Sequence, residues 1–249
     1  MTGFSDHFAF AARSYASHRP RYPDALFDWL ASVSSRRERA WDCGTGNGQA
    51  AVALAGHFEQ VVASDPSSAQ LASADRVAGV HYVAMTAEQC ALRAHSVDLV
   101  TVAQALHWFD PQRFFAQVHH VLRPGGSLAV WSYGLLSMDP AVDALLRRFY
   151  FDVLGPFWPV ERLLVDSGYA GIELPYAETS VPHFTMEATW SLARLIGYVS
   201  TWSAVGRYRT ATGEDPIPAF AHDLRAAWGM DDTRRARWPL VVRLGRKAV

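Results

Sequence analysis

A stretch of nine residues, Trp41–Gln49 (WDCGTGNGQ), has the residue types and spacing that could hold a ligand. An acidic residue, Asp42, stands two positions before a Gly-x-Gly-x-Gly run, where a short apolar segment would meet a helix. Gly44, Gly46 and Gly48 carry no Cβ atom, so the backbone can turn tightly and a ligand can lie against its amide groups. The helix expected next would direct its unpaired N–H groups into the same space. A flexible surface turn is the alternative interpretation, because short glycine motifs also occur by chance.

A second acidic residue, Asp65, ends the short apolar run at 61–64. It follows the glycine turn by about twenty residues, the spacing at which a carboxylate can accept hydrogen bonds from the ribose hydroxyls of an adenosine cofactor. We therefore expect Asp65 to be a ribose ligand. Its alternative role is to cap the helix expected at 68–77, since Asp followed by Pro66 also favours the start of a helix.

The elements around these two acids alternate between strand and helix. Short apolar runs predict strands at 39–43, 60–64, 80–84, 97–103 and 127–133, with helices between them, including one at 49–55. The clearest helix is expected at 111–122, where Asp110 is the predicted N-cap and Pro111 occupies the first turn. Repeated strand–helix units predict a Rossmann-like, doubly wound α/β fold, whose ligands bind beyond the carboxyl ends of the strands.

The region before this core, residues 1–38, has the pattern of two helices separated by a stiff connector, Tyr15–Pro23. The connector carries Arg19 and Tyr22, and it could fold back as a lid over a cofactor. Arg19 would then be a counter-ion for a carboxylate of the cofactor or the substrate, and a plain surface charge is the alternative. We therefore predict an N-terminal helical lid.

The region after residue 135 has longer helical stretches rich in aromatic residues. Two further strands are expected, at 172–181 and 238–245, with a helical insertion at about 186–229 between them. The whole chain, 1–249, is thus predicted to be one domain. Its core at 39–135 and its last part, 136–249, would share a mostly parallel, seven-stranded sheet with helices on both faces.

The bulk composition excludes several classes of function. The formal net charge of -1 gives no electrostatic footprint for nucleic acid. Two cysteines, Cys43 and Cys90, are too few for a disulfide framework, and no Cys/His spacing suggests a metal site. The chain has neither the pattern of a secretory signal nor an apolar run of about eighteen residues. We expect a soluble, cytoplasmic protein that binds no metal, nucleic acid or membrane.

Taken together, the motifs resemble those of class I S-adenosylmethionine-dependent methyltransferases, in the small-molecule type 11 group. The resemblance covers most of the chain and rests on five segments in the family's order: Asp42–Gly48, Asp65, Thr86–Glu88, Gln104–Asp110 and Leu122–Leu128. A looser similarity, in Tyr15–Pro23 and Tyr198–Ser203, points to the branch of trans-aconitate and related small-acid methyltransferases.

The resemblance implies S-adenosylmethionine as the cofactor and S-adenosylhomocysteine as the product. The residues that it implies at the cofactor are Asp42, Gly44, Thr45, Gly46, Asp65, Pro66, Thr86, Ala87, Glu88, Gln104 and Ala105, together with Arg19 and Tyr22. The family usually has Asp where this chain has Thr86, so a backbone contact from Ala87 would replace a side-chain bond to the adenine. The predicted acceptor pocket contains Trp108, Tyr133 and Trp202, for which packing in the core is the alternative role.

Methyl transfer from a sulfonium is an in-line displacement, to which proximity and orientation can contribute about 7–11 kcal/mol. A general base is therefore optional: a carboxylate acceptor needs none, whereas a neutral amine or hydroxyl would profit from one. His107, at the carboxyl end of a central strand, is the candidate base. Packing at the floor of the site is its alternative role.

The sequence therefore predicts methyl transfer to a small-molecule carboxylate, hydroxyl or ring nitrogen. An NAD(P)-dependent oxidoreductase is one alternative, because a glycine turn followed by a later acid is shared with that class. The Gly-x-Gly-x-Gly spacing and the position of Asp42 argue against it. A catalytically silent protein that keeps the cofactor pocket is another alternative. A monomer and a homodimer are both compatible with the sequence.

Overall fold

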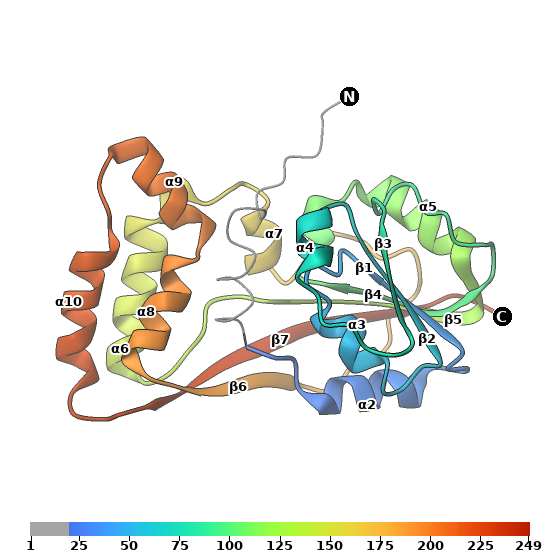
Figure 1. The fold of residues 1–249 in the computed structure, drawn as a ribbon, viewed down its shortest axis with the longest axis horizontal. Helices are drawn as coiled ribbons and strands as arrows, with labels where there is room; N and C mark the ends of the chain where they lie inside the picture. Colours follow the sequence, from blue (N-terminus) through green and yellow to red (C-terminus); the bar gives the residue numbers. More distant parts are fainter. Residues whose placement is uncertain (1–19) are drawn as a thin grey trace.

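The computed structural model describes residues 20–249 (Figure 1). In chain order its elements are α2 (Asp24–Val33), β1 (Arg39–Cys43), α3 (Gln49–Leu54), β2 (Gln60–Asp65), α4 (Ser68–Ala72), β3 (Val80–Ala84), β4 (Val97–Ala103), η1 (Leu106–Trp108), α5 (Pro111–Val121), β5 (Leu122–Tyr133), α6 (Pro140–Arg147), η2 (Arg148–Val153), η3 (Gly155–Phe157), α7 (Arg162–Asp166), β6 (Phe184–Trp190), α8 (Leu192–Ser200), α9 (Ser203–Thr212), α10 (Ile217–Trp228) and β7 (Arg234–Arg246). Within this range the strands form one seven-stranded sheet in the order β3-β2-β1-β4-β5-β7-β6. Strands β1 to β5 are parallel, whereas β7 is antiparallel to both of its neighbours. The predicted mostly parallel α/β fold is confirmed.

The central strands send alternate side chains into two separate cores, one on each face of the sheet. Ala40 and Leu99 belong to the core that includes residues of α2 and α3. Trp41 and Val100 belong to the core that includes residues of α5 and α7. Because both faces are covered, the central strand β4 is buried along nearly its whole length, including the polar residues Asp98 and Thr101.

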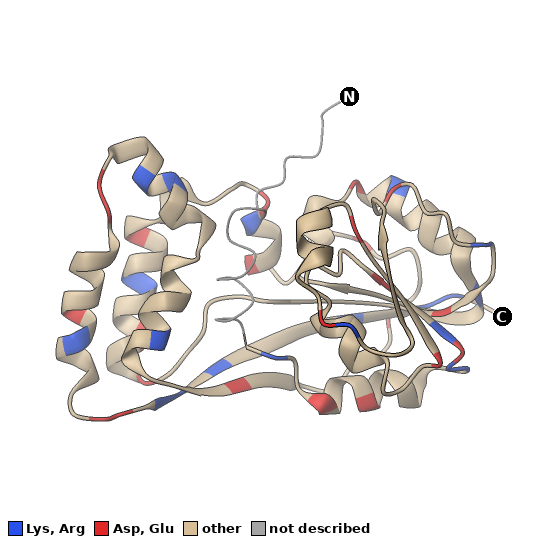
Figure 2. Cartoon of the chain, in the orientation of Figure 1, with Lys and Arg blue, Asp and Glu red and all other residues tan. Residues whose placement is uncertain are grey.

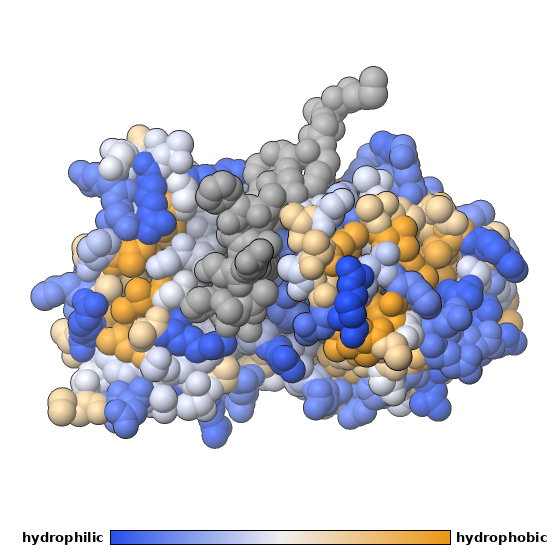
Figure 3. Space-filling model, viewed as in Figure 1, coloured by the Kyte–Doolittle hydropathy of each residue, from blue (hydrophilic) through white to orange (hydrophobic). Residues whose placement is uncertain are grey.

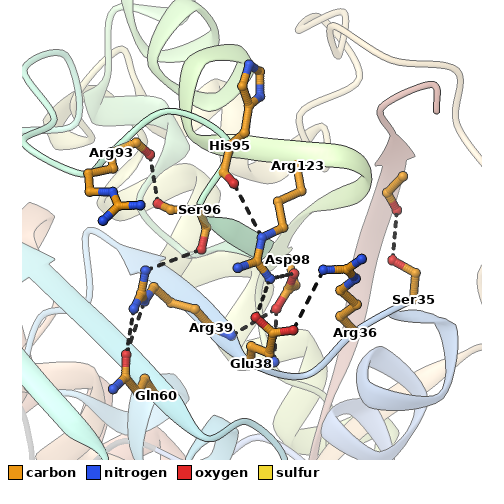
Figure 4. Close-up of polar contacts among 11 residues, drawn as sticks. Ser35, Arg36, Glu38, Arg39, Gln60, Arg93, His95, Ser96, Asp98 and Arg123 are labelled. Carbon is orange, nitrogen blue, oxygen red and sulfur yellow. Dashed lines mark hydrogen bonds and ion pairs between the residues drawn. The ribbon is translucent and has the colours of Figure 1, made fainter.

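A buried carboxylate joins three strands at their amino ends (Figure 4). Asp98, which is 2% exposed, accepts hydrogen bonds at 2.9 Å from the backbone N–H groups of Glu38 and Arg39. Its other oxygen accepts from Nη1 of Arg123 at 2.7 Å, and Arg123 also pairs with the Glu38 side chain at 2.8 Å. A buried charge with this many partners is stabilised in place. It therefore supports the amino edge of the sheet, opposite the edge where ligands bind.

Helices α6, α8, α9 and α10 form a group on the left of Figure 1, which we call the helical cap. Helix α10 packs against α6 and α8. Three of the four helices lie between β6 and β7, as predicted for an insertion between the last two strands. The insertion occupies 191–233 rather than 186–229, because β6 continues to residue 190.

The strand predicted at 172–181 is wrong. This segment is a loop with one isolated bridge to the sheet, Glu178 to Gly245, and the strand at this position in the fold is β6. Pro175 and Pro182 lack the N–H that a strand ladder requires. Ile172 and Leu174 are nevertheless buried, so their apolar pattern reports packing of a loop and not pairing of a strand.

Several other boundaries differ from the prediction by a few residues. Strand β5 begins at residue 122 and not 127, because Leu122 already pairs with Val97 before an irregularity in the ladder. The last strand spans 234–246 rather than 238–245. The helix expected at 68–77 ends at residue 72, where the Ser73 hydroxyl donates to the carbonyl of Gln70. The helices expected at 49–55 and 111–122 each end one residue early, and β2 is one residue longer than expected.

The N-terminal lid predicted at 1–38 is described only from residue 20 onward. Helix α2 is the second of the two predicted helices, and it buries Leu26 and Leu30 against the sheet core. The first predicted helix and Arg19 lie outside the described residues. The part of the lid that is described therefore packs as part of the fold.

Charged and apolar residues are distributed over both halves of the molecule. Acidic and basic positions are interspersed along the elements in Figure 2. In the view of Figure 3, apolar side chains gather over the helical cap and again over the sheet half. None of the helices in residues 20–249 is long and apolar enough to cross a bilayer.

Candidate functional site

The glycine turn joins β1 to α3 at the carboxyl edge of the sheet. Gly44 has a φ of 68°, and a Cβ atom at this residue would lie 2.6 Å from the Cβ of Ala105 and 2.9 Å from the ring of Phe109. The turn is thus packed directly against the segment that follows β4, which only glycine permits. A Cβ on Gly46 would meet nothing closer than 3.9 Å, so its backbone borders open space that a ligand can approach.

Asp42 lies at the end of β1 and is fully buried. Its two oxygens accept hydrogen bonds from the hydroxyls of Thr45, at 2.5 Å, and Thr101, at 2.7 Å. Burial raises the pKa of Asp42 to about 6, although both threonine hydroxyls favour the charged form. In this arrangement the carboxylate holds the glycine turn against β4, so its predicted role at the cofactor would be to position the turn.

Asp65 lies at the end of β2, beside the same turn. Its Oδ2 accepts from the backbone N–H of Gly46 at 2.9 Å, and its Oδ1 accepts from the N–H of Ser67 at 2.9 Å. The N-cap of α4 is Ser67, whose hydroxyl accepts from Gln70, so the alternative role of Asp65 as the cap is wrong. The structure therefore brings Gly46, Asp65 and the following Pro66 together, as binding of an adenosine cofactor requires.

Gln104 follows β4 and has a left-handed backbone, with a φ of 56°. Its backbone N–H donates to the carbonyl of Trp131 at 3.0 Å, and its Nε2 donates to the carbonyl of Tyr133 at 2.9 Å. Its Oε1 is buried and has no hydrogen-bond partner within residues 20–249. A buried acceptor without a donor is costly, and strained backbone often occurs at binding sites. This atom therefore fits a ligand that carries a donor, such as the ammonium group of an amino acid.

The loop after β3 contributes Thr86, Ala87 and Glu88 to the same edge. Ala87 is buried and Thr86 is partly buried. Glu88 accepts from the backbone N–H of Asp110 at 3.0 Å, which ties this loop to the start of α5. Asp110 itself caps α5, as predicted, by accepting from the N–H of Arg113. Glu88 thus has a structural partner in addition to its predicted place at the cofactor.

His107 lies on η1, where its Nδ1 is 3.0 Å from the hydroxyl of Tyr169. The ring of Trp108 packs against the imidazole, with a centroid distance of 4.7 Å. Burial, reinforced by the positive charge of Arg162, lowers the pKa of His107 to about 3. A histidine with this pKa is neutral near pH 7 and is a weak base.

The fully buried Tyr169 was not found by sequence reasoning, although it orients His107. Its φ is 62°, and it follows Gly168, which also has a left-handed backbone. The available sequence signal was the glycine, which indicates that a helix ends here. Nothing local indicated that the next side chain would reach a histidine that lies 62 positions earlier.

The predicted acceptor residues fall in two places. Tyr133, at the end of β5, packs edge-on against the Tyr22 ring at 6.4 Å. Trp108 is 39% exposed on η1. Trp202 belongs to an aromatic cluster in the other half, where its ring lies 5.5 Å from Tyr150. Of the three predicted acceptor residues, the structure therefore places Tyr133 and Trp108 at the carboxyl edge and Trp202 with the cap. In residues 20–249 no three His, Cys, Asp or Glu side chains gather as metal ligands would.

Because His107 is a weak base, its replacement by glutamine is expected to lower turnover by less than roughly tenfold. Loss of a general base would cost about 10²- to 10⁴-fold. Glutamine keeps a polar partner for Tyr169 and removes the imidazole. Steady-state rates of S-adenosylhomocysteine release measure the effect. A loss of about 100-fold or more, with cofactor affinity unchanged, would assign the base to His107.

The same substitution tests the pKa. In the unfolded chain His107 binds a proton below its usual pKa of about 6.5, and in the folded chain only below about 3. Between these values the unfolded state binds more protons, so the stability of the wild type decreases as the pH falls. Comparison of the two proteins by thermal unfolding at each pH cancels the contributions of other groups. As the pH falls from 6.5, the wild type should lose stability relative to the glutamine variant. A difference in stability between the two proteins that does not change with pH would contradict a lowered pKa of His107.

Comparisons with known proteins agree with this geometry. The family description "Methyltransferase domain" (type 11) matches residues 41–130. A Dictyostelium discoideum protein that carries the name of a methyltransferase is 34% identical over 235 residues, which cover 93% of this chain and 89% of that protein. An uncharacterized methyltransferase of Mycobacterium tuberculosis is 42% identical over 128 residues, which cover 50% of this chain and 51% of its own length.

A solved structure is similar in fold to this protein over nearly the whole chain. It is described as a type II methyltransferase from Anaeromyxobacter dehalogenans, and it is 45% identical to this chain with a TM-score of 0.88. The match covers 93% of this chain and 99% of that structure.

Proposed function

Because the chain belongs to the class I S-adenosylmethionine-dependent methyltransferases, we propose that it methylates a small-molecule acceptor, which binds between the carboxyl edge of the sheet and the helical cap. The acceptor group is a carboxylate, a hydroxyl or a ring nitrogen. Family membership excludes the nicotinamide-dependent oxidoreductase that the glycine turn alone left open.

The observation that carries this proposal is the buried Oε1 of Gln104, which has no partner in the described part of the chain. The residue after Gln104, Ala105, is the one that Gly44 packs against, so Gln104 and the turn lie at the same edge of the sheet. We assign Oε1 to the ammonium group of the cofactor's amino acid, and Asp65 to the ribose hydroxyls. Gly46, whose N–H donates to Asp65, has open backbone in the same turn.

When bound, S-adenosylmethionine supplies a methyl group on a sulfonium, which an acceptor nucleophile displaces in line. Tyr22, Tyr133 and Trp108 supply apolar surface that orients the acceptor and excludes water. His107 is neutral and a weak base, which supports an acceptor that is already anionic or otherwise needs no base. Catalysis would then rest on alignment, which can contribute about 7–11 kcal/mol.

Transfer of a labelled methyl group tests the size class of the acceptor. The purified protein is incubated with methyl-labelled S-adenosylmethionine and a cell extract, which is then separated into small molecules, protein and nucleic acid. We expect a labelled compound other than the cofactor in the small-molecule fraction only, and much less of it with an Asp65→Ala variant at a cofactor concentration that does not saturate it. Label transferred only to protein or nucleic acid would overturn the proposal. Cofactor binding without transfer of label to any other compound would favour the catalytically silent alternative.

A further inference from the structure

Arg162 is the first residue of α7, the helix that packs against η1 and β5. Its guanidinium carbon lies 5.1 Å from the ring centre of Trp158 and 5.5 Å from that of Tyr150. The side chain is only 21% exposed. A charge this deeply placed among aromatic rings is costly unless it has specific partners.

Only one side of the guanidinium has such partners. Nε donates to the hydroxyl of Tyr150 at 2.6 Å and to Oδ1 of Asp166 at 3.1 Å. Burial raises the pKa of Tyr150, so its phenol stays protonated and donates to Asp166 at 2.8 Å. The two Nη groups make no hydrogen bond within residues 20–249. Tyr150 and Asp166 therefore fix the orientation of the Arg162 guanidinium. They leave its two Nη groups without a protein partner in this range.

Arg243, on β7, is a contrasting case, because both of its Nη groups have protein partners. The Nη groups of Arg243 donate to the carbonyls of Tyr169 and Ile172 and to the carboxylate of Glu178. These bonds hold the loop before β6 on β7, which is a structural role. Arg162 differs from Arg243 because its side chain bonds to protein through Nε alone.

The Nη groups of Arg234 likewise have protein partners. They donate to the side chains of Asp139 and Asp231 and to the carbonyl of Trp228. The hollow that Arg234 lines with Met138, Arg235 and Arg237 is therefore held by ion pairs. Both Nη groups of Arg234 thus have protein partners, whereas neither Nη group of Arg162 has one within residues 20–249.

The position of Arg162 relates it to the acceptor side of the site. Its charge acts on both members of the His107–Tyr169 pair, disfavouring protonation of the imidazole. Trp202 completes the aromatic surroundings, with its ring 5.7 Å from Trp158. The guanidinium of Arg162 thus lies beside aromatic rings and close to the segment that follows β4.

We propose that Arg162 binds a carboxylate of the methyl acceptor and so selects small organic acids with an apolar or aromatic body. Two parallel Nη–H groups match the geometry of a carboxylate, and the low local dielectric strengthens the pairing. Trp158 and Trp202 would pack against the body of the acid. This inference rests on the proposed function, since it names the class of the small-molecule acceptor.

Matched acids and amides test the assignment. The probes are phenylacetate and 3-phenylpropanoate, each paired with its primary amide, which has the same shape without the charge. Calorimetry with the S-adenosylhomocysteine-loaded wild type should show each acid binding at least roughly tenfold more tightly than its amide, since bonds to charged groups contribute about 1.5–3 kcal/mol. Arg162→Gln should remove this preference and leave the affinity for S-adenosylhomocysteine unchanged.

Two further variants keep the test decisive. Arg148→Gln removes an equal charge from an exposed residue of the neighbouring η2 and should keep the acid preference. Arg162→Lys keeps the charge without the planar fork and should retain only part of the preference, which decides the question if Arg162→Gln does not fold.

The unfavourable outcomes are distinct from one another. Equal binding of acids and amides by the wild type, or no binding of either acid, would overturn the role of Arg162. So would an unchanged preference in Arg162→Gln or, where that variant does not fold, in Arg162→Lys. A wild type that does not bind S-adenosylhomocysteine would instead contradict the proposed function.

Discussion

Replacement of Asp65 by alanine is expected to weaken binding of S-adenosylmethionine and S-adenosylhomocysteine by roughly 10- to 100-fold, as loss of a charged hydrogen-bond acceptor costs about 1.5–3 kcal/mol. The carboxylate accepts from the backbone N–H groups of Gly46 and Ser67, so its position is fixed before the cofactor arrives. The substitution removes both the ribose ligand and the bond that orients the turn. Isothermal titration of the two proteins with each compound measures the loss.

The matched control for Asp65→Ala is Asp75→Ala, which removes the same charge from an exposed residue past the end of α4. Its affinity for both sulfur compounds should equal that of the wild type. NADH is titrated in parallel and should bind to none of the three proteins. An Asp65→Ala variant that binds S-adenosylmethionine like the wild type would remove Asp65 from the site.

Replacement of Gly44 by alanine is expected to destabilise the fold by about 2–5 kcal/mol and to abolish measurable cofactor binding. Part of this cost is the left-handed backbone at a φ of 68°, and the rest is the contact of the new methyl with Ala105 and Phe109. Neither neighbour can yield easily, since Ala105 is buried at the start of η1. The turn would have to move away from the segment that carries Gln104. Thermal unfolding and titration with S-adenosylhomocysteine measure the two effects.

Gly213→Ala separates the cost of the left-handed backbone from the cost of the methyl contact with Ala105 and Phe109. Gly213 has a similar φ of 76° at the end of α9, but a Cβ there would meet no atom within 4 Å. This variant should show the backbone strain alone, about 1–2 kcal/mol, with normal cofactor affinity. Equal losses of stability in both variants would show that packing against Ala105 contributes nothing.

The charges of the site differ between its two sides. Asp42 and Asp65 lie at the ends of β1 and β2, where a cofactor with a sulfonium and an ammonium group would bind. Arg162 lies on α7, on the side of η1 and the aromatic cluster, where Asp166 pairs with its Nε at 3.1 Å. The carboxylates on the first side would favour a cationic cofactor, and the Nη groups on the second would favour an anionic group of the acceptor through direct hydrogen bonds. The proposed acid specificity is consistent with this separation.

The sequence by itself determined the core of this fold and the cofactor edge, because both depend on local patterns. The run at 97–103 predicts a strand, and the repeated strand–helix units predict a sheet with helices on both faces. The spacing from Gly44 to Asp65 predicts one strand–turn–helix–strand unit. Asp110 and Pro111 marked the start of α5 for the same reason, as a cap and its first turn are neighbours in the chain. Such signals do not depend on how distant segments pack.

Only the tertiary structure decided which side chains meet across the site. Tyr169 contacts His107, and Asp98 contacts Arg39, although 62 and 59 positions separate the members of these pairs. The segment at 172–181 buries apolar residues as a strand would, yet Pro175 within it and Pro182 just after it lack the N–H that a ladder requires, and β6 makes the pairing instead. The unused donors of Arg162 follow from the packing of α7 beside Tyr150. Local sequence indicates whether a side chain is buried, whereas the path of the whole folded chain determines which residues it is buried against.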